Sequence, residues 1–148
     1  MNVEKVIKTE KEIPLPQRTL IHLSLVENKI NEIVTCALKP YDVSLQQFNV
    51  LRILRGQKGK PANLCTLNER MVTKMSNTTR LVDKLITKGF VDRIICESNR
   101  RKVEINITEA GEKILLQMDS AMKEAEVRIL KNFNSKELEN LNSLLDKF

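Results

Sequence analysis

The chain has 148 residues, of which 41% are hydrophobic and 30% are charged. These proportions are typical of a globular helical protein and exclude a disordered chain. No stretch approaches 18 uninterrupted apolar residues, so we expect neither a transmembrane helix nor a membrane partner. Residues 1–11 are rich in charge and lack the apolar core of a signal peptide, and we therefore expect a cytoplasmic protein.

The formal net charge is +6, and one central segment of 32 residues alone carries +5. Residues 72–103 contain eight basic and three acidic residues, whereas residues 104–148 contain six basic and nine acidic ones. A polyanionic partner would explain this distribution, because neutralised phosphates release counterions and thereby drive binding. On charge alone, a solvated basic face explains the segment equally well.

The sequence contains no recognisable set of catalytic or metal-binding residues. Cys36, Cys65 and Cys96 are far apart and form no CxxC pair, which argues against a zinc site, and the chain has one histidine, His22. We therefore predict no enzyme, no catalytic residue, no metal and no cofactor. Each cysteine is expected in a core or sheet position, with Cys96 the most exposed of the three.

The first 40 residues predict an arm followed by one long helix. Residues 1–16 are expected to form a mobile or loosely docked arm, with Pro14 and Pro16 near its end. Apolar residues then recur at helical spacing over residues 17–39, and Pro40 ends the helix. Part of this helix is apolar on more than one face, which favours packing against a partner chain.

Two further helices have clear starting signals. Ser44 and Gln47 form the pattern of a capping box, which starts a helix that closes at about Gly56. Asn63 is the predicted N-cap of a short helix over residues 64–71.

A fourth helix is predicted from about Lys74 to Lys88, with Thr73 and Ser76 as competing N-caps. Its inward positions are predicted to be Met75, Thr78, Leu81, Val82, Leu85 and Ile86. Its outward positions are predicted to be Ser76, Asn77, Thr79, Arg80, Lys84 and Thr87.

The hydrophobic period then changes from helical to strand-like. Residues 90–95 and 102–107 predict two strands of a hairpin with a polar, basic tip. Thr108 is the predicted N-cap of a long helix to about residue 132, and Ser135 that of the last helix. The predicted order is α-α-α-α-β-β-α-α, a mainly helical fold with a small β-hairpin wing.

A short helix, a turn, a second helix and a basic hairpin form the layout of a winged helix-turn-helix, which binds double-stranded DNA. We expect the 74–88 helix to enter the major groove, where Arg80 suits guanine and Asn77 suits adenine. Lys84 and Lys88 are expected to contact phosphates, and Arg100 at the hairpin tip to enter the minor groove. An amphipathic helix with a solvated polar face is the alternative. The predicted DNA-binding residues are Ser76, Asn77, Thr79, Arg80, Lys84, Lys88, Arg100 and Arg101.

Several spaced motifs follow one another along the chain. They are QFNVLRIL at 47–54, TRLVDKL at 79–85, KGFVDR at 88–93, Asn99-Arg100-Arg101, and ITEAG at 107–111. In order and spacing these motifs resemble those of the multiple antibiotic resistance regulator (MarR) family, whose DxR stands at the position of Asn99-Arg100-Arg101. The resemblance extends in register over about residues 40–115. Asn99 departs from the family's aspartate and, unlike it, cannot form a salt bridge.

The resemblance implies a homodimeric transcriptional regulator, a repressor of a pseudo-palindromic operator that a small-molecule effector relieves. It implies an arm and dimerisation helix over 1–40, the winged helix-turn-helix over 41–108 and C-terminal dimerisation helices over 109–148. It also implies a charge-assisted pair between Asp83 and Arg101 that braces the wing.

Two alternative functions remain open. The first is a thiol redox sensor on the same scaffold, using Cys36 or Cys96. The second is a winged-helix protein-interaction module without DNA function. Oxidant treatment of Cys→Ser variants tests the first, and the salt dependence of DNA binding tests the second.

Overall fold

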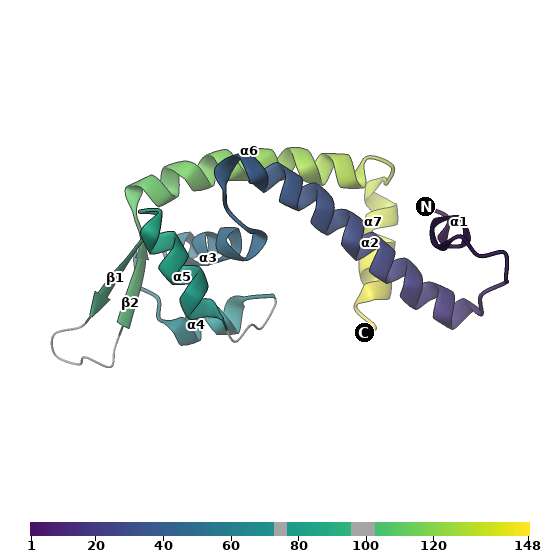
Figure 1. The fold of residues 1–148 in the computed structure, drawn as a ribbon, viewed down its shortest axis with the longest axis horizontal. Helices are drawn as coiled ribbons and strands as arrows, with labels where there is room; N and C mark the ends of the chain where they lie inside the picture. Colours follow the sequence, from purple (N-terminus) through teal and green to yellow (C-terminus); the bar gives the residue numbers. More distant parts are fainter. Residues whose placement is uncertain (73–76, 96–102) are drawn as a thin grey trace. The chain divides into compact units, whose positions relative to one another are not determined.

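The structure is a computed structural model that describes residues 1–72, 77–95 and 103–148. Its elements follow in the order α1, α2, η1, α3, α4, α5, β1, β2, α6, α7 (Figure 1). The predicted fold class is confirmed, because the eight predicted elements are present in the predicted order. Two short elements were not predicted, the helix α1 (Val3–Ile7) and the 3-10 helix η1 (Lys39–Tyr41).

The chain forms two compact units, residues 1–34 with 124–148, and residues 35–123. The first unit holds α1, most of α2 (Leu15–Leu38), the end of α6 (Glu109–Leu130) and α7 (Ser135–Leu145). The second unit holds the helices and strands between η1 and β2, together with the first part of α6.

Both predicted helix starts in the first part of the second unit are confirmed. The Ser44 hydroxyl accepts a hydrogen bond from the Gln47 amide at 3.2 Å, and the Gln47 side chain accepts one from the Ser44 amide at 3.0 Å. This capping box starts α3 (Leu45–Gly56). The Asn63 side chain accepts from the Thr66 amide at 2.8 Å and starts α4 (Leu64–Arg70).

Two other helices have an N-cap that differs from the predicted one. Asn77 is the N-cap of α5 (Thr78–Thr87), so the helix starts later than predicted, and the predicted caps Thr73 and Ser76 lie outside the described residues. Asn134, not Ser135, is the N-cap of α7, and its side chain forms a capping box with Glu137. The reason is that Asn134 has the extended backbone that an N-cap requires (φ −87°, ψ 169°).

The two strands form an antiparallel hairpin in which β1 (Val91–Ile95) pairs with β2 (Val103–Ile107), with Val91 opposite Ile107. Ala62 pairs with Ile105 through two backbone hydrogen bonds of 3.0 and 2.7 Å. This bridge ties the segment before α4 to the hairpin, and the Ile105 side chain is fully buried there.

The start of α6 is packed closely against the turn that follows α5. The Thr108 hydroxyl accepts from the Gly111 amide at 3.0 Å and donates to the Gly89 carbonyl at 2.7 Å, which confirms Thr108 as a helix cap. A Cβ at Gly111 would lie 2.1 Å from the Phe90 carbonyl oxygen, so only glycine fits without displacement. The helix start therefore fixes the base of the hairpin.

The core of the second unit draws on all its regular helices and both strands. Its largest fully buried side chains include Phe48, Leu51, Leu67, Val82, Leu85, Val91, Ile105 and Leu115. At its edge, Nη1 of Arg55 lies 2.5 Å from Oδ2 of Asp119, an ion pair between α3 and α6. Burying this many apolar side chains gives the unit its own hydrophobic core and a rigid support for α5.

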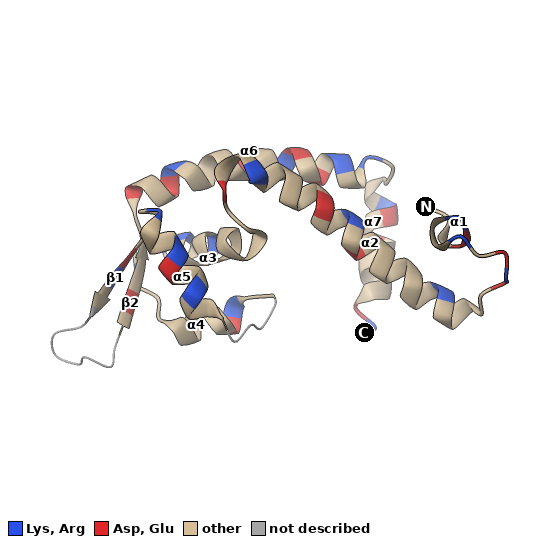
Figure 2. Cartoon of the chain, viewed as in Figure 1, with Lys and Arg blue, Asp and Glu red and all other residues tan. Residues whose placement is uncertain are grey.

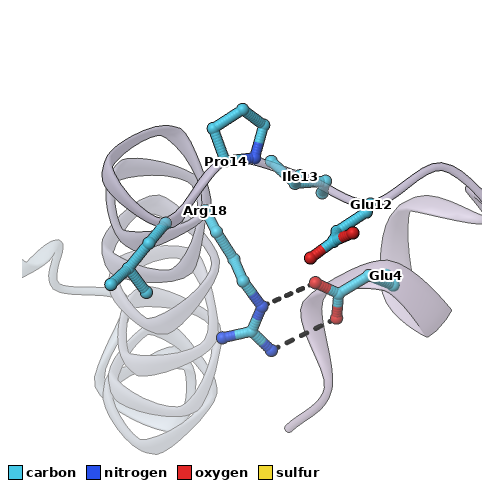
Figure 3. Close-up of a pocket in the computed structure, with 6 residues that line it drawn as sticks. Glu4, Glu12, Ile13, Pro14 and Arg18 are labelled. Atoms are coloured by element: carbon cyan, nitrogen blue, oxygen red, sulfur yellow. Dashed lines mark hydrogen bonds and ion pairs between the residues drawn. The ribbon is translucent and has the colours of Figure 1, made fainter.

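In the first unit, the segment predicted as a mobile arm contains a docked helix. The Arg18 guanidinium on α2 binds both carboxylate oxygens of Glu4 on α1, with Nε–Oε1 2.5 Å and Nη2–Oε2 3.2 Å (Figure 3). Glu12 lies beside this pair at an open pocket of about 500 Å³ (Figure 3). The Val3 side chain is fully buried. The expectation of a loosely docked segment is therefore wrong for α1.

Candidate nucleic-acid interface

Helix α5 separates buried from exposed side chains as the sequence predicts. Thr78, Val82 and Leu85 are buried, and the helix contacts α3, α4 and β1. The described residues predicted to face outward are exposed, namely Asn77, Thr79, Arg80, Lys84 and Thr87. Figure 2 shows basic stretches along this helix. The buried face therefore fixes the helix while the polar face remains accessible to a ligand. Ser76, which completes the predicted set on this helix, lies outside the described residues.

The two cations on the exposed face are available for binding. The side chains of Arg80 and Lys84 form no hydrogen bond or ion pair with any residue in the described ranges. An arginine presents a planar fork that matches two acceptors on one guanine, whereas a lysine presents a point charge suited to phosphate. The exposed face of α5 thus presents one planar guanidinium and one ammonium point charge.

A side-chain hydrogen bond joins the two helices that precede the hairpin. The Thr78 hydroxyl, at the first position of α5, donates to the side-chain oxygen of Asn68 on α4. Because Thr78 is buried, this bond sets how the start of α5 meets α4. Sequence reasoning assigned no role to Asn68, since nothing in its local pattern indicates a partner ten residues away.

Lys88, predicted to hold a phosphate, has a partner within the chain. Its ammonium group donates to both the backbone carbonyl and the carboxylate of Asp42, in the loop before α3. This hydrogen bond is the main cause of the lowered pKa of Asp42, and the charge of Lys84 lowers it further. Lys88 therefore anchors the end of α5, and a phosphate would have to replace the Asp42 carboxylate to bind there.

The base of the hairpin is joined to α5 by an ion pair that the sequence did not indicate. Nη1 of Arg93 on β1 lies 3.3 Å from Oδ1 of Asp83 on α5. The predicted partner of Asp83, Arg101, lies outside the described residues, as does Arg100. The pairing with Arg93 depends on where β1 lies against α5, and that position cannot be derived from local periodicity.

Comparison with known proteins identifies the family. The sequence pattern of the MarR family matches residues 43–103, a range that includes α3, α4, α5 and β1. YpoP, a helix-turn-helix-type transcriptional regulator of Bacillus subtilis, is 30% identical over 122 residues, 82% of each chain. The chain belongs to the MarR family. PecS, a helix-turn-helix-type transcriptional regulator of Dickeya dadantii, is 28% identical over 135 residues, 89% of this chain and 80% of PecS.

Solved structures of MarR proteins share this fold. A cysteine-to-serine mutant of MarR from E. coli, in complex with operator DNA, is 27% identical with a TM-score of 0.76, covering 90% of this chain and 93% of that one. The MarR transcription factor from Planctomyces limnophilus is 27% identical with a TM-score of 0.73, covering 93% and 100% of the two chains. This chain is therefore a DNA-binding, helix-turn-helix-type transcriptional regulator, and the MarR family is not an enzyme family.

Two of the three cysteines of this MarR-family chain lie at positions that differ from the predicted ones. Cys36 and Cys65 are exposed, so their predicted core positions are wrong, and Cys96 lies outside the described residues. The Cys65 thiol donates to Glu69 at 3.3 Å, and this hydrogen bond raises the pKa of the thiol. Since the thiolate is the reactive form, this hydrogen bond makes the Cys65 thiol less reactive than an ordinary cysteine. Exposed Cys36 leaves the thiol-switch alternative open.

The described residues of this MarR-family chain form neither a metal site nor a membrane-spanning helix. Among the described residues, no group of three or more His, Cys, Asp or Glu side chains is arranged to hold a metal ion. Within those ranges, too, no helix has the length and apolar character that crossing a membrane requires.

Proposed function

We propose that this chain is a homodimeric repressor that binds a pseudo-palindromic operator through the exposed face of α5 and is released by a small ligand. The observation that carries the proposal is the exposed row Asn77, Thr79, Arg80 and Lys84 on a helix whose opposite face is buried. Donors of these types match base edges and phosphates in the major groove.

The exposed apolar residues of the first unit support a dimer. Helix α7 has no buried residue, although Leu141, Leu144 and Leu145 lie along it. On α2, Leu20 is 61% exposed, and Leu23, Val26 and Ile30 follow at helical spacing with 36–38% exposure. Large contiguous apolar surfaces on a soluble chain mark association sites, because their burial is what stabilises the assembly.

A pair of substitutions on α7 tests the dimer. Leu144→Glu introduces a charge at an apolar position, and Ser143→Glu introduces the same charge at the neighbouring polar position. We expect the native chain and Ser143→Glu to sediment at twice the chain mass of 17.0 kDa. Leu144→Glu should dissociate into monomers at concentrations where the other two proteins remain dimers. A native chain of monomer mass at micromolar concentration would contradict the proposal.

The dimer makes a geometric prediction for the operator. A two-fold axis through the dimer places two copies of α5 in successive major grooves, so half-sites should be centred roughly 34–36 Å apart, one helical turn. Inserting five base pairs between the half-sites turns one of them to the opposite side of the duplex, and binding should then be lost. Binding that ignores this insertion would contradict simultaneous engagement of both half-sites.

Release by a small ligand is tested separately. A ligand that binds the free protein raises its Tm with ligand concentration. We expect at least one compound of a metabolite set to raise the Tm and to lower the affinity of the protein for its operator. Because coupling is reciprocal, the operator should lower the affinity of the protein for that compound by the same factor. Compounds that bind without altering operator affinity would contradict this part of the proposal.

A further inference from the structure

A second feature of the DNA-binding unit lies away from the exposed face of α5. A hollow of about 320 Å³ is formed between one face of α3 and the end of α4. Its lining residues are Asn49, Arg52, Ile53 and Gly56 of α3, with Arg70 and Val72. The α3 residues follow at spacings of three and four, so they share one face of the helix. The volume is at the lower end of the roughly 300–1,000 Å³ typical of small-molecule sites.

The charge of the hollow has one sign. Two arginines line it, and none of its six lining residues is acidic. Neither Arg52 nor Arg70 forms an ion pair or side-chain hydrogen bond within the described part of the chain. By contrast, nearby Arg55 is neutralised by Asp119. Two unneutralised guanidinium groups at one concave surface repel each other, and an anion between them would relieve that repulsion.

One of the two arginines is already held in place. The Arg52 guanidinium carbon lies 5.7 Å from the ring centroid of Phe48, a cation–π distance, and Phe48 is itself buried at 2% exposure. A guanidinium resting on a fixed ring loses less side-chain entropy when it binds. Gly56 adds no side chain to the hollow, and a Cβ built there meets no atom within 4 Å.

We propose that this hollow is an oxyanion site in which Arg52 and Arg70 hold one phosphate or carboxylate group through their planar forks. Bidentate binding of oxyanions is the geometry that arginine favours over lysine. Asn49 supplies a neutral donor at the same surface. The oxyanion comes either from a phosphodiester of the bound DNA or from a free small anion. The DNA source rests on the proposed function, and the free anion does not.

The free-anion source is tested with inorganic phosphate at constant ionic strength. The Nε–Hε NMR signals of Arg52 and Arg70 should shift together and saturate, whereas that of exposed Arg128 on α6 should not. Gly56→Leu fills the hollow without removing a charge, and glycine is the poorer helix former by about 1 kcal/mol. We therefore expect this variant to fold and to lose the saturable shift.

The DNA source is tested by the salt dependence of binding. Each neutralised phosphate contributes a slope of about 0.9 in log K against log salt. Because the two arginines hold one phosphate, Arg52→Ala with Arg70→Ala should lower the slope by about 0.9. That corresponds to an affinity change between 50 and 200 mM salt that is smaller by a factor of about 3.5. The control Lys123→Ala with Arg128→Ala removes the same charge from α6 and should leave the slope unchanged.

Either result supports the oxyanion site and identifies its source. A saturable phosphate shift that Gly56→Leu abolishes indicates a free anion, and a slope change confined to the Arg52/Arg70 variant indicates the DNA backbone. The proposal is overturned if phosphate shifts all three arginines in proportion to its concentration and both double variants share the native slope. Because the first experiment needs no DNA, failure of the proposed function would leave its result intact.

Discussion

Replacing Gly111 by alanine tests the contact that fixes the base of the hairpin. The added Cβ would lie 2.1 Å from the Phe90 carbonyl oxygen and 2.8 Å from Cγ1 of Ile107, where real contacts essentially never fall under 3.0 Å. One backbone must therefore move by about 0.9 Å or more, and Phe90 O also accepts the Thr108 amide at 3.1 Å. Overpacking costs about 1–3 kcal/mol, and the strained hydrogen bond costs about 1 kcal/mol more.

Alanine also favours the helical backbone by about 1 kcal/mol over glycine, which partly offsets these costs. We therefore expect Gly111→Ala to lower the free energy of unfolding by about 1–3 kcal/mol, measured by urea denaturation at one protein concentration. Gly56→Ala is the matched control, because its Cβ meets nothing within 4 Å, and it should stabilise by about 0.5–1 kcal/mol. Equal stability of the two variants would refute the close contact at Gly111.

Two further predictions concern the ion pairs. Asp83→Asn removes the ion-pair partner of Arg93. It also removes one negative charge, and that loss of charge alone would predict tighter DNA binding. We expect weaker operator binding with less than about 1 kcal/mol lost in stability, because the pair is partly exposed. Uniformly tighter binding would show that the hairpin needs no such ion pair. The hydrogen bond from Arg18 lowers the pKa of Glu4, so the stabilisation of docked α1 is complete above the ordinary glutamate pKa and is lost as pH falls through the lowered value. The Arg18 Nε–Hε NMR signal of the native chain should follow this titration, whereas that of the control variant Glu4→Gln should not change with pH. A pH-independent signal in the native chain would contradict the stabilisation of α1 by the Arg18–Glu4 pair.

Sequence alone predicts the elements in which apolar residues recur regularly over a long segment, and those that have an unambiguous N-cap. Ser44 and Asn63 start their helices as predicted, because each is a strong N-cap whose bonds lie within three residues. Where two adjacent residues both qualify, as Asn134 and Ser135 do, only the backbone conformation decides. The five residues of α1 are too few for periodicity to indicate a helix.

The candidate site also contains some features that the sequence predicts and others that it does not. The outward face of α5 follows from a period of 3.6 residues, so Arg80 and Lys84 could be placed correctly without a structure. The bonds of Asp83 to Arg93 and of Lys88 to Asp42 join different elements, and their partners depend on packing that no local pattern encodes. The hollow containing Arg52 and Arg70 has the same origin, since its two arginines lie on different helices.

The most direct test of the account is base discrimination by Arg80→Ala and Lys84→Ala on the DNA next to the protein's own gene. The operator is located by footprinting, and each variant is titrated against it and against its single-base changes. We predict that Arg80→Ala loses discrimination at one position per half-site, about 1–3 kcal/mol, while Lys84→Ala weakens all sequences alike and lowers the salt slope by about one. Equal, uniform losses from both variants would contradict base recognition by this face, as would native protein with neither sequence preference nor salt dependence.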